Sequence, residues 1–190
     1  VYIHLPFCEK RCDYCYYLSL SGTPRGDMRL YAEQVCAEAA MYAALPRFAG
    51  RGPRFIYFGG GTPSLLPADV LQSLLASLAE RLQWQAAEEI TFECSPKSTT
   101  AEKLAILRAA GVNRLSLGIQ QLDDEILRAS GRIHLVSDAL RAVAEIKSFD
   151  FAELNVDLIS GLPGQTDASF IEGVQRVIDL APDCVTIYQL

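Results

Sequence analysis

The sequence is poor in histidine and tryptophan, with two and one of these residues among its 190, and it lacks any long apolar run. No stretch approaches the roughly 18 consecutive apolar residues that a membrane-spanning helix needs. A basic start followed by an apolar segment, the mark of a secretory signal, is also missing. Basic residues are in the minority, with 17 lysines and arginines against 23 aspartates and glutamates. Because nucleic acids and anionic membranes are bound by basic patches, we expect no nucleic-acid partner, no membrane association and a cytoplasmic location.

Half of the residues are apolar and 21% are charged, which is typical of a folded globular domain. Apolar runs and helical periodicity alternate along the chain. We expect strands at 1–5, 54–58, 89–93, 114–118, 153–160 and 184–190. Helical segments occupy the intervals, the first through Met28 and Val35 and the last over 170–180. Strict alternation of this kind favours a parallel sheet covered by helices.

The number of strand–helix units limits the architecture. A closed eight-stranded barrel needs about 200 residues or more. The six expected strands therefore predict either an incomplete barrel or an open doubly wound sheet, in one domain over 1–190. The chain stops on a strand with no helix to cover it. We therefore expect 1–190 to be a core domain, with the C-terminal part of the parent protein missing.

Chemically distinctive residues follow the ends of the predicted strands. In chain order they are Cys8, Cys12, Cys15, Gly59, Gly60, Gly61, Glu93, Cys94, Gln120, Asp157 and Tyr188. In a parallel α/β fold the carboxyl ends of the strands share one edge, and ligands bind at that edge. The sequence therefore predicts a single active site there.

Three of the six cysteines crowd together with the spacing Cys-x3-Cys-x2-Cys, at Cys8, Cys12 and Cys15. Without a secretory signal, such a cluster indicates a metal site in a reducing compartment. Three thiolates can hold a soft metal centre, but a closed zinc site or a fully protein-ligated 4Fe–4S cluster has four ligands. Either a distant residue completes the set, or the fourth position is open to a ligand. A structural zinc site completed by His134 is the alternative.

The run Gly59-Gly60-Gly61-Thr62-Pro63 follows the second predicted strand. Glycines there let a backbone approach a ligand without interference from Cβ. The run is not a dinucleotide fingerprint, because the later glycine is absent, and it is not a P-loop, because no Gly-Lys-Ser/Thr follows. Beside an open metal site it predicts a place where main-chain groups and the Thr62 hydroxyl hold a polar ligand.

Taken in order, five segments resemble one known family. They are Tyr2–Cys8 with Cys12 and Cys15, Phe58–Ser64, Val112–Gln120, Gly131–His134 and Asp157–Thr166. The first resembles the opening motif of radical S-adenosylmethionine (SAM) enzymes, and the set resembles the oxygen-independent coproporphyrinogen III oxidase-like family. The resemblance covers essentially the whole chain. It implies an α/β fold that is a partial (β/α)6 barrel of the radical SAM type, truncated after the sixth strand.

The resemblance also implies the cofactors. A 4Fe–4S cluster would sit on Cys8, Cys12 and Cys15, with its open iron bound by SAM. An electron from a donor such as flavodoxin or ferredoxin would cleave SAM to methionine and a 5′-deoxyadenosyl radical, which takes a hydrogen from a small-molecule substrate.

The family pattern accommodates one or two SAM molecules. By resemblance, the contacts of the first are Tyr2, Gly60 and Glu93. Those of the second are Tyr14, Gly61, Thr62, Gln120, Arg132 and Asp157. Glu93 and Asp157 are also the predicted catalytic residues, since a buried unpaired carboxylate is costly within an apolar strand.

Departures from the family pattern favour one branch. The decarboxylase branch carries a further cysteine where this chain has Tyr17, and the haem-chaperone branch carries Glu-x-Asn-Pro where this chain has Glu93-Cys94-Ser95-Pro96. We therefore expect the methyltransferase and cyclopropanase branch. There a methyl or methylene group passes from a second SAM to an sp² carbon of a small aromatic or heteroaromatic substrate in natural-product biosynthesis. The alternatives are a tetrapyrrole enzyme, which decarboxylates coproporphyrinogen III or degrades haem, and a haem chaperone.

Overall fold

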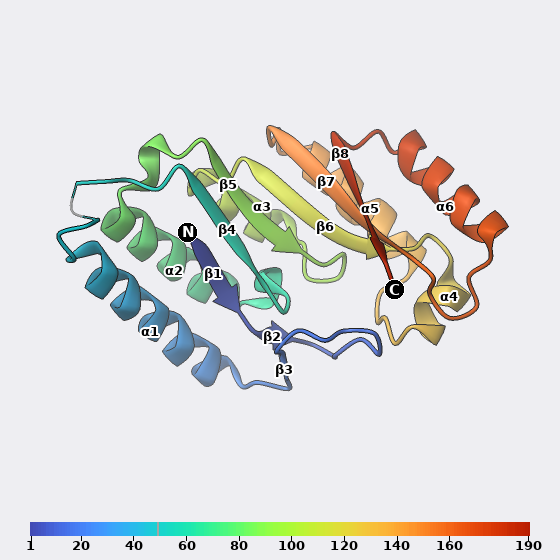
Figure 1. Ribbon diagram of the computed structural model, residues 1–190, viewed down its shortest axis with the longest axis horizontal. Helices are drawn as coiled ribbons and strands as arrows, with labels where there is room; N and C mark the ends of the chain where they lie inside the picture. Colours follow the sequence, from blue (N-terminus) through green and yellow to red (C-terminus); the bar gives the residue numbers. More distant parts are fainter. Residues whose placement is uncertain (49) are drawn as a thin grey trace.

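The computed structural model describes residues 1–48 and 50–190. Its centre is a six-stranded sheet in which every neighbouring pair runs parallel. The strands are β1 (Tyr2–Leu5), β4 (Phe55–Gly60), β5 (Glu89–Cys94), β6 (Arg114–Gln120), β7 (Glu153–Ser160) and β8 (Cys184–Gln189). They lie side by side in chain order, so each crossover returns the chain to the next position in the sheet (Figure 1).

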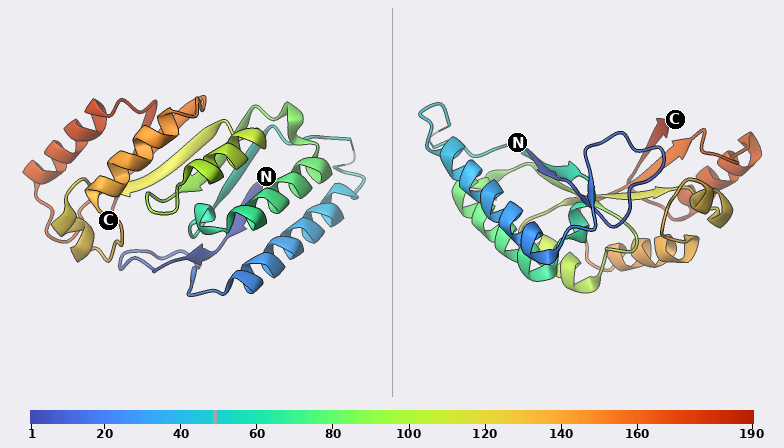
Figure 2. Two further views of the ribbon diagram at one scale, coloured as in Figure 1. Left: turned by 180° about the vertical axis from the view of Figure 1, so that it is seen from behind. Right: turned by 90° about the horizontal axis from the view of Figure 1, so that it is seen from below.

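The long helices lie on the outer, convex side of the curved sheet (Figure 2). The helices are α1 (Arg25–Ala43), α2 (Ala68–Leu82), α3 (Ala101–Ala109), α4 (Asp124–Ala129), α5 (Val136–Lys147) and α6 (Asp167–Asp179), with 3-10 turns η1 (Pro63–Leu65) and η2 (Trp84–Ala86). A doubly wound sheet reverses its strand order and carries helices on both faces. The described residues form a sheet without such a reversal. The arrangement is therefore the predicted partial (β/α)6 barrel.

The core lies between the sheet and these helices. Helix α2 buries a leucine stripe at helical spacing, formed by Leu71, Leu74, Leu75 and Leu78. On the sheet, Phe58 and Phe92 are paired across β4 and β5 with their ring centroids 5.2 Å apart. Full burial of a side chain of this size stabilises the fold by about 1.5–3 kcal/mol. This packing leaves the carboxyl ends of the strands available for polar residues.

A separate parallel pair, β2 (Phe7–Cys8) and β3 (Leu20–Ser21), closes the base of residues 8–19, which we call the cysteine loop and which begins with the last residue of β2. The Leu20 amide donates to the Pro6 carbonyl at 2.7 Å, which ties the two ends of the loop together. In both figures the loop runs along the carboxyl ends of the sheet strands toward the end of β8. The fold therefore places the cysteine loop over the predicted active edge.

Three strands and one helix extend beyond the predicted limits, β5 by a single residue, Cys94. Strand β4 continues through Gly59 and Gly60, which pair with β1, and β6 continues to Gln120. Glycine has a low intrinsic preference for strands, but pairing with a neighbouring strand overrides it here. Helix α6 begins at Asp167 because the Thr166 hydroxyl accepts a hydrogen bond from the Ser169 amide at 3.1 Å.

Candidate active site

A cavity of about 330 Å³ opens at the carboxyl ends of the strands. Of the predicted site residues, it is lined by Cys8, Cys12, Tyr14, Cys15, Gly60, Gly61, Thr62, Glu93, Gln120, Arg132 and Asp157. These residues come from the cysteine loop, from strands β4 to β7 and from the segment between α4 and α5. The convergence expected from strand order is therefore observed.

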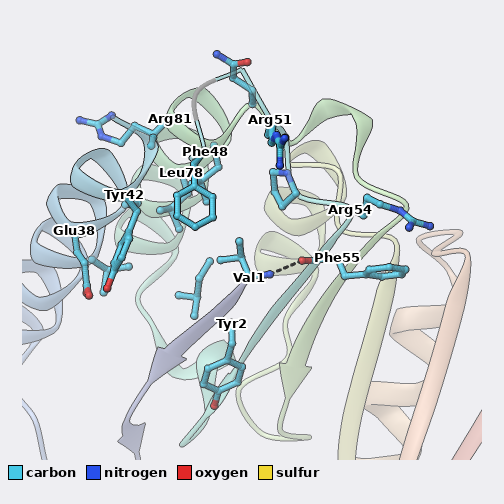
Figure 3. Close-up of a pocket in the computed structure, with 18 of the residues that line it drawn as sticks. Val1, Tyr2, Glu38, Tyr42, Phe48, Arg51, Arg54, Phe55, Leu78 and Arg81 are labelled. Carbon is cyan, nitrogen blue, oxygen red and sulfur yellow. Dashed lines mark hydrogen bonds between the residues drawn. The ribbon is translucent and has the colours of Figure 1, made fainter. Parts of the chain in front are cut away.

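The predicted SAM contact Tyr2 lies in β1, next to Tyr57. It lines a larger cavity of about 890 Å³ among α1, α2 and the starts of β1 and β4, together with Tyr42, Phe48 and Phe55 (Figure 3). The Tyr2 ring stacks on Tyr57, with ring centroids 6.0 Å apart. Tyr57 in turn donates a hydrogen bond to Glu93 at 2.7 Å, so Tyr2 lies beside a residue that holds a carboxylate of the first cavity, and its SAM contact stays a prediction.

The three clustered cysteines are free thiols, each partly exposed. The Cys8 sulfur lies 3.7 Å from the Thr62 hydroxyl, and burial raises the pKa of Cys8 above its ordinary value. Arg11 holds the loop shape by donating two hydrogen bonds to the Cys15 carbonyl, at 3.0 and 2.7 Å. The loop backbone is therefore braced while its sulfur atoms stay accessible.

The geometry argues against a zinc ion completed by His134. Within residues 1–48 and 50–190, no three His, Cys, Asp or Glu side chains are grouped to hold one metal ion. His134 is buried, and its two ring nitrogens are engaged by the Ile119 carbonyl and the Arg132 side chain. In an iron–sulfur cluster each thiolate binds a different iron, so the sulfur atoms need not converge on one point.

Neighbouring parts of the protein leave no room for a side chain at Gly60 and Gly61. Gly60 has a φ of +118°, and a Cβ there would lie 2.6 Å from the His4 ring. A Cβ on Gly61 would lie 2.7 Å from Pro6 and Phe7 backbone atoms, and the Thr62 amide donates to the Phe7 carbonyl at 2.7 Å. Close approach to a ligand was the predicted reason for these glycines. The structure adds a different one, which is tight packing of the run against β1 and β2.

Glu93 is held at the cavity wall by two donors. Its carboxylate accepts hydrogen bonds from the Tyr57 hydroxyl at 2.7 Å and from the Gly60 amide at 3.2 Å. Burial raises the pKa of Glu93 above its ordinary value, the Tyr57 hydrogen bond opposes this rise, and the Asp157 charge adds to it. A carboxylate so placed is stabilised by a cation in the cavity.

Asp157 sits in a network formed by β6, β7 and β8. It accepts hydrogen bonds from the Ser116 hydroxyl and the Asn155 amide, each at 2.8 Å. Thr186 in turn donates to the Asn155 carbonyl oxygen at 2.9 Å. Burial raises the pKa of Asp157, and the bonds from Ser116 and Asn155 oppose that rise. The carboxylate is therefore oriented by neutral donors. Asp157 also lines the cavity, so its negative charge, when ionised, faces a ligand bound there.

Gln120 occupies an unusual backbone position. Its φ is +69°, and the β6–β7 pairing is irregular between Gly118 and Gln120. A non-glycine residue in this region is strained, and bulges of this kind often redirect a side chain at a functional site. Among the described residues the buried Gln120 Oε1 and the buried Tyr14 hydroxyl have no hydrogen-bond partner. Both residues line the cavity, so their polar groups are candidates to contact a polar ligand there.

The Arg132 guanidinium is buried in the cavity wall near the cysteine loop. It donates to the Gly118 carbonyl at 2.7 Å, to the Cys12 sulfur at 3.4 Å and, through Nε, to His134 Nδ1 at 3.3 Å. The pKa of Arg132 is raised: burial opposes the shift, while Tyr14 and Cys12 favour it. Arg132 therefore links the cysteine loop to β6.

Sequence reasoning missed the residues that orient the two carboxylates. Tyr57 lies in the middle of β4, and Ser116 and Asn155 lie in the buried strands β6 and β7. A signal was present, because Ser116 and Asn155 are polar residues flanked by apolar ones in otherwise buried runs. Buried polar residues are expected to have partners. For Tyr57 the sequence held no comparable signal.

The sequence profile of the Radical SAM superfamily matches residues 2–177. The chain belongs to this superfamily. Its members bind a 4Fe–4S cluster and SAM, act on small-molecule substrates and need a reductant, in agreement with those expectations. None of the helices in the described part of the chain is long and apolar enough to cross a membrane. The absence of a nucleic-acid partner stays a prediction.

Similar proteins are found in animals and bacteria. The mouse mitochondrial "radical S-adenosyl methionine domain-containing protein 1" is 37% identical over 193 residues, covering 100% of this chain and 42% of that protein. The haem chaperone HemW of Escherichia coli is 35% identical, covering 100% and 50%. The solved structure of coproporphyrinogen III oxidase (HemN) from E. coli has a TM-score of 0.86 at 33% identity, covering 99% and 43%. This chain therefore spans half or less of these proteins.

These comparisons correct the preferred branch. The similar proteins above include a haem chaperone and a coproporphyrinogen oxidase, which fit the alternative interpretation better than methyl transfer. The methyltransferase TsrM from Kitasatospora setae has a TM-score of 0.66 at 17% identity, covering 99% of this chain and 36% of that one. That likeness shows the fold alone. Single departures such as Tyr17 had too little weight to decide between branches that share the whole core.

The residues of the cavity fit the family's cofactors. Three accessible thiols lie on one braced loop, which suits a cluster with three protein ligands. Glu93 and Asp157 are partly buried carboxylates with raised pKa values, which a positively charged sulfonium would stabilise. The unsatisfied Gln120 oxygen and Tyr14 hydroxyl suit a ligand with hydroxyl and amino groups.

Proposed function

We propose that this chain is the cluster- and SAM-binding core of a haem-handling protein similar to HemW. Support comes first from the identity of 35% with the E. coli haem chaperone over the whole of this chain. The observation that carries the proposal is a group of exposed tyrosines at the mouth of the cavity.

This group, the tyrosine rim, consists of Tyr16, Tyr17 and Tyr188, which all line the cavity. Tyr16 and Tyr17 stack with their ring centroids 4.8 Å apart, although 83% and 52% of their surfaces are exposed. Tyr188 is 54% exposed and comes from β8. Stacked aromatic rings in water offer a face to another flat, conjugated molecule. A porphyrin is such a molecule.

Size and charge support a tetrapyrrole at the rim. The cavity of about 330 Å³ is at the small end of the range for small-molecule sites, so SAM would occupy most of it. A macrocycle larger than SAM would then bind at the mouth of the cavity, against the tyrosine rim. Lys10, Arg11 and Lys97 also line the cavity and offer cations to the propionate groups of a porphyrin.

In the proposed core, Cys8, Cys12 and Cys15 hold the cluster, and Glu93 and Asp157 face the positive charge of SAM. When bound, the cluster and SAM supply one-electron reductive chemistry, with an external protein as the electron donor. Tyr57 orients Glu93 by its hydrogen bond at 2.7 Å, and Ser116 orients Asp157 at 2.8 Å. The catalytic roles of both carboxylates are part of this proposal, and so are the SAM contacts of the other predicted residues, which are Tyr2, Tyr14, Gly60, Gly61, Thr62, Gln120 and Arg132.

A second candidate is oxygen-independent decarboxylation of coproporphyrinogen III. It is favoured by the TM-score of 0.86 with the E. coli enzyme at 33% identity. The same rim and cations would suit this substrate, which is also a tetrapyrrole with carboxylate side groups. The two candidates differ in what happens after binding, so the products separate them.

The test uses the full-length gene product with an anaerobically reconstituted cluster. Titration with haem, followed by its visible absorption, should give saturable binding to one site. Replacing the two stacked rim residues together, by Tyr16→Ala and Tyr17→Ala, should weaken haem binding at least tenfold. The matched control is Tyr42→Ala, because Tyr42 is 54% exposed but lies on α1 outside the rim.

Product analysis with SAM and a reductant decides among the candidates. Haem binding without decarboxylation of coproporphyrinogen III supports the proposed function. Conversion of coproporphyrinogen III to protoporphyrinogen IX supports the second candidate. Absence of both haem binding and coproporphyrinogen turnover contradicts both, and S-adenosylhomocysteine formed with an aromatic acceptor would restore methyl transfer.

A further inference from the structure

His134 is held in a single protonation and tautomeric state by its two hydrogen bonds. Its Nε2 lies 3.0 Å from the Ile119 carbonyl, which only accepts, so Nε2 carries the hydrogen. Its Nδ1 receives the Nε–H of Arg132 at 3.3 Å, so Nδ1 must be a bare acceptor. A protonated imidazole would carry a hydrogen on Nδ1 as well. Two N–H donors, one from His134 Nδ1 and one from Arg132 Nε, would then face each other. The geometry therefore requires a neutral ring.

The surroundings of His134 agree with this state. Burial, with the Arg132 charge adding to it, lowers the pKa of His134 to about 4. Asp124 and Asp138 oppose this shift from the flanking helices without reversing it. The ring is buried, so it serves as a fixed acceptor for Arg132 rather than as a proton donor to a ligand in the cavity.

Arg132 donates hydrogen bonds to two fixed acceptors. One is His134 Nδ1, and the other is the Gly118 carbonyl of β6, at 2.7 Å. Its remaining nitrogen points at the Cys12 sulfur from 3.4 Å. The turn before it is pressed against the cysteine loop, since a Cβ on Gly131 would lie 2.8 Å from the Asp13 carboxyl group. Arg132 therefore has little freedom to leave Cys12.

We propose that His134 is a positioning residue that aims the Arg132 guanidinium at the sulfur of Cys12 and thereby raises the reduction potential of the cluster. The inference rests on the superfamily's cluster and on Cys12 as one of its ligands, and it is independent of the substrate. A donor to a ligating sulfur stabilises the reduced, more negative cluster over the oxidised one. The electron comes from the external reductant, and no atom is transferred.

The experiment measures the cluster potential by a redox titration followed by electron paramagnetic resonance, on the full-length reconstituted protein. His134→Leu removes the acceptor for Arg132, and Arg132→Lys keeps the charge but loses the fixed fork. Both should make reduction about tenfold less favourable, a shift of ~59 mV to more negative potential for one electron. His134→Asn keeps an acceptor near Nδ1 and should recover most of the potential.

The matched control is Arg128→Gln, which removes an arginine charge from the exposed surface of α4, where Arg128 lies 3.8 Å from Asp124. Its potential should equal that of the wild type. An unchanged potential in Arg132→Lys with a loaded cluster would overturn the proposal, whether or not His134→Leu folds. Nitrogen-15 spectra of His134 give an independent readout, because a hydrogen on Nδ1 instead of Nε2 would also overturn it.

Discussion

Replacing Gly60 by alanine tests how tightly the glycine run is packed. Gly60 has a φ of +118°, a region that costs a residue with a side chain about 1–3 kcal/mol. The new Cβ would also lie 2.6 Å from the His4 ring, so the ring must turn and lose its 3.2 Å contact with the Tyr2 hydroxyl. A hydrogen bond of this kind contributes about 1 kcal/mol. We therefore expect Gly60→Ala to lower the free energy of unfolding by about 2–4 kcal/mol.

The matched control is Gly164→Ala. Gly164 also has a positive φ, +81°, but a Cβ there would meet nothing within 4 Å. Its cost should be backbone strain alone, about 1–2 kcal/mol. Urea unfolding of the two variants and the wild type measures both values. If Gly60→Ala is no more destabilising than Gly164→Ala, the reasoning about the His4 contact is refuted.

Three further predictions concern the site. Cys12→Ala should abolish stable cluster loading, measured as iron per chain, and full iron content in that variant would refute the ligand assignment. Asp157→Asn should weaken SAM binding about tenfold by calorimetry while the melting temperature stays near that of the wild type, since Ser116 can still bond the amide; a variant that unfolds instead would mark Asp157 as structural. Burial raises the pKa of Glu93 above its ordinary value of 4.5, so SAM affinity should fall as pH drops through that raised value. Tyr57→Phe removes a bond that lowers this pKa, so the loss should begin at a higher pH; identical pH profiles would contradict the role of Tyr57.

The stability of the protein should respond to pH through the same two carboxylates. Both have folded-state pKa values raised by burial, so the folded chain binds protons more tightly than the unfolded chain. The free energy of unfolding therefore declines as pH rises between the ordinary and the raised values. Ionising Glu93 and Asp157 therefore lowers the free energy of unfolding, as expected for carboxylates that a site holds for a cationic ligand.

The sequence alone determined the fold class, a parallel α/β sheet, and indicated a metal site. Strand positions followed from apolar runs, and the strand predicted at 153–160 matches β7 at both ends. The spacing of Cys8, Cys12 and Cys15 indicated a metal site, and the family resemblance implied that it holds a 4Fe–4S cluster. These features are local, since a strand, a helix or a short ligand loop is encoded within a few neighbouring residues.

Only the tertiary structure decided how the site is held together. The Arg132–Cys12 contact joins residues 120 positions apart, and the Tyr57–Glu93 bond joins residues 36 apart. The neutral state of His134 and the crowding at Gly60 likewise depend on which strands become neighbours. Such contacts exist only after the sheet has formed and the cysteine loop has closed over its edge. No local pattern encodes them, because each depends on the distance and angle between segments that the chain brings together in space.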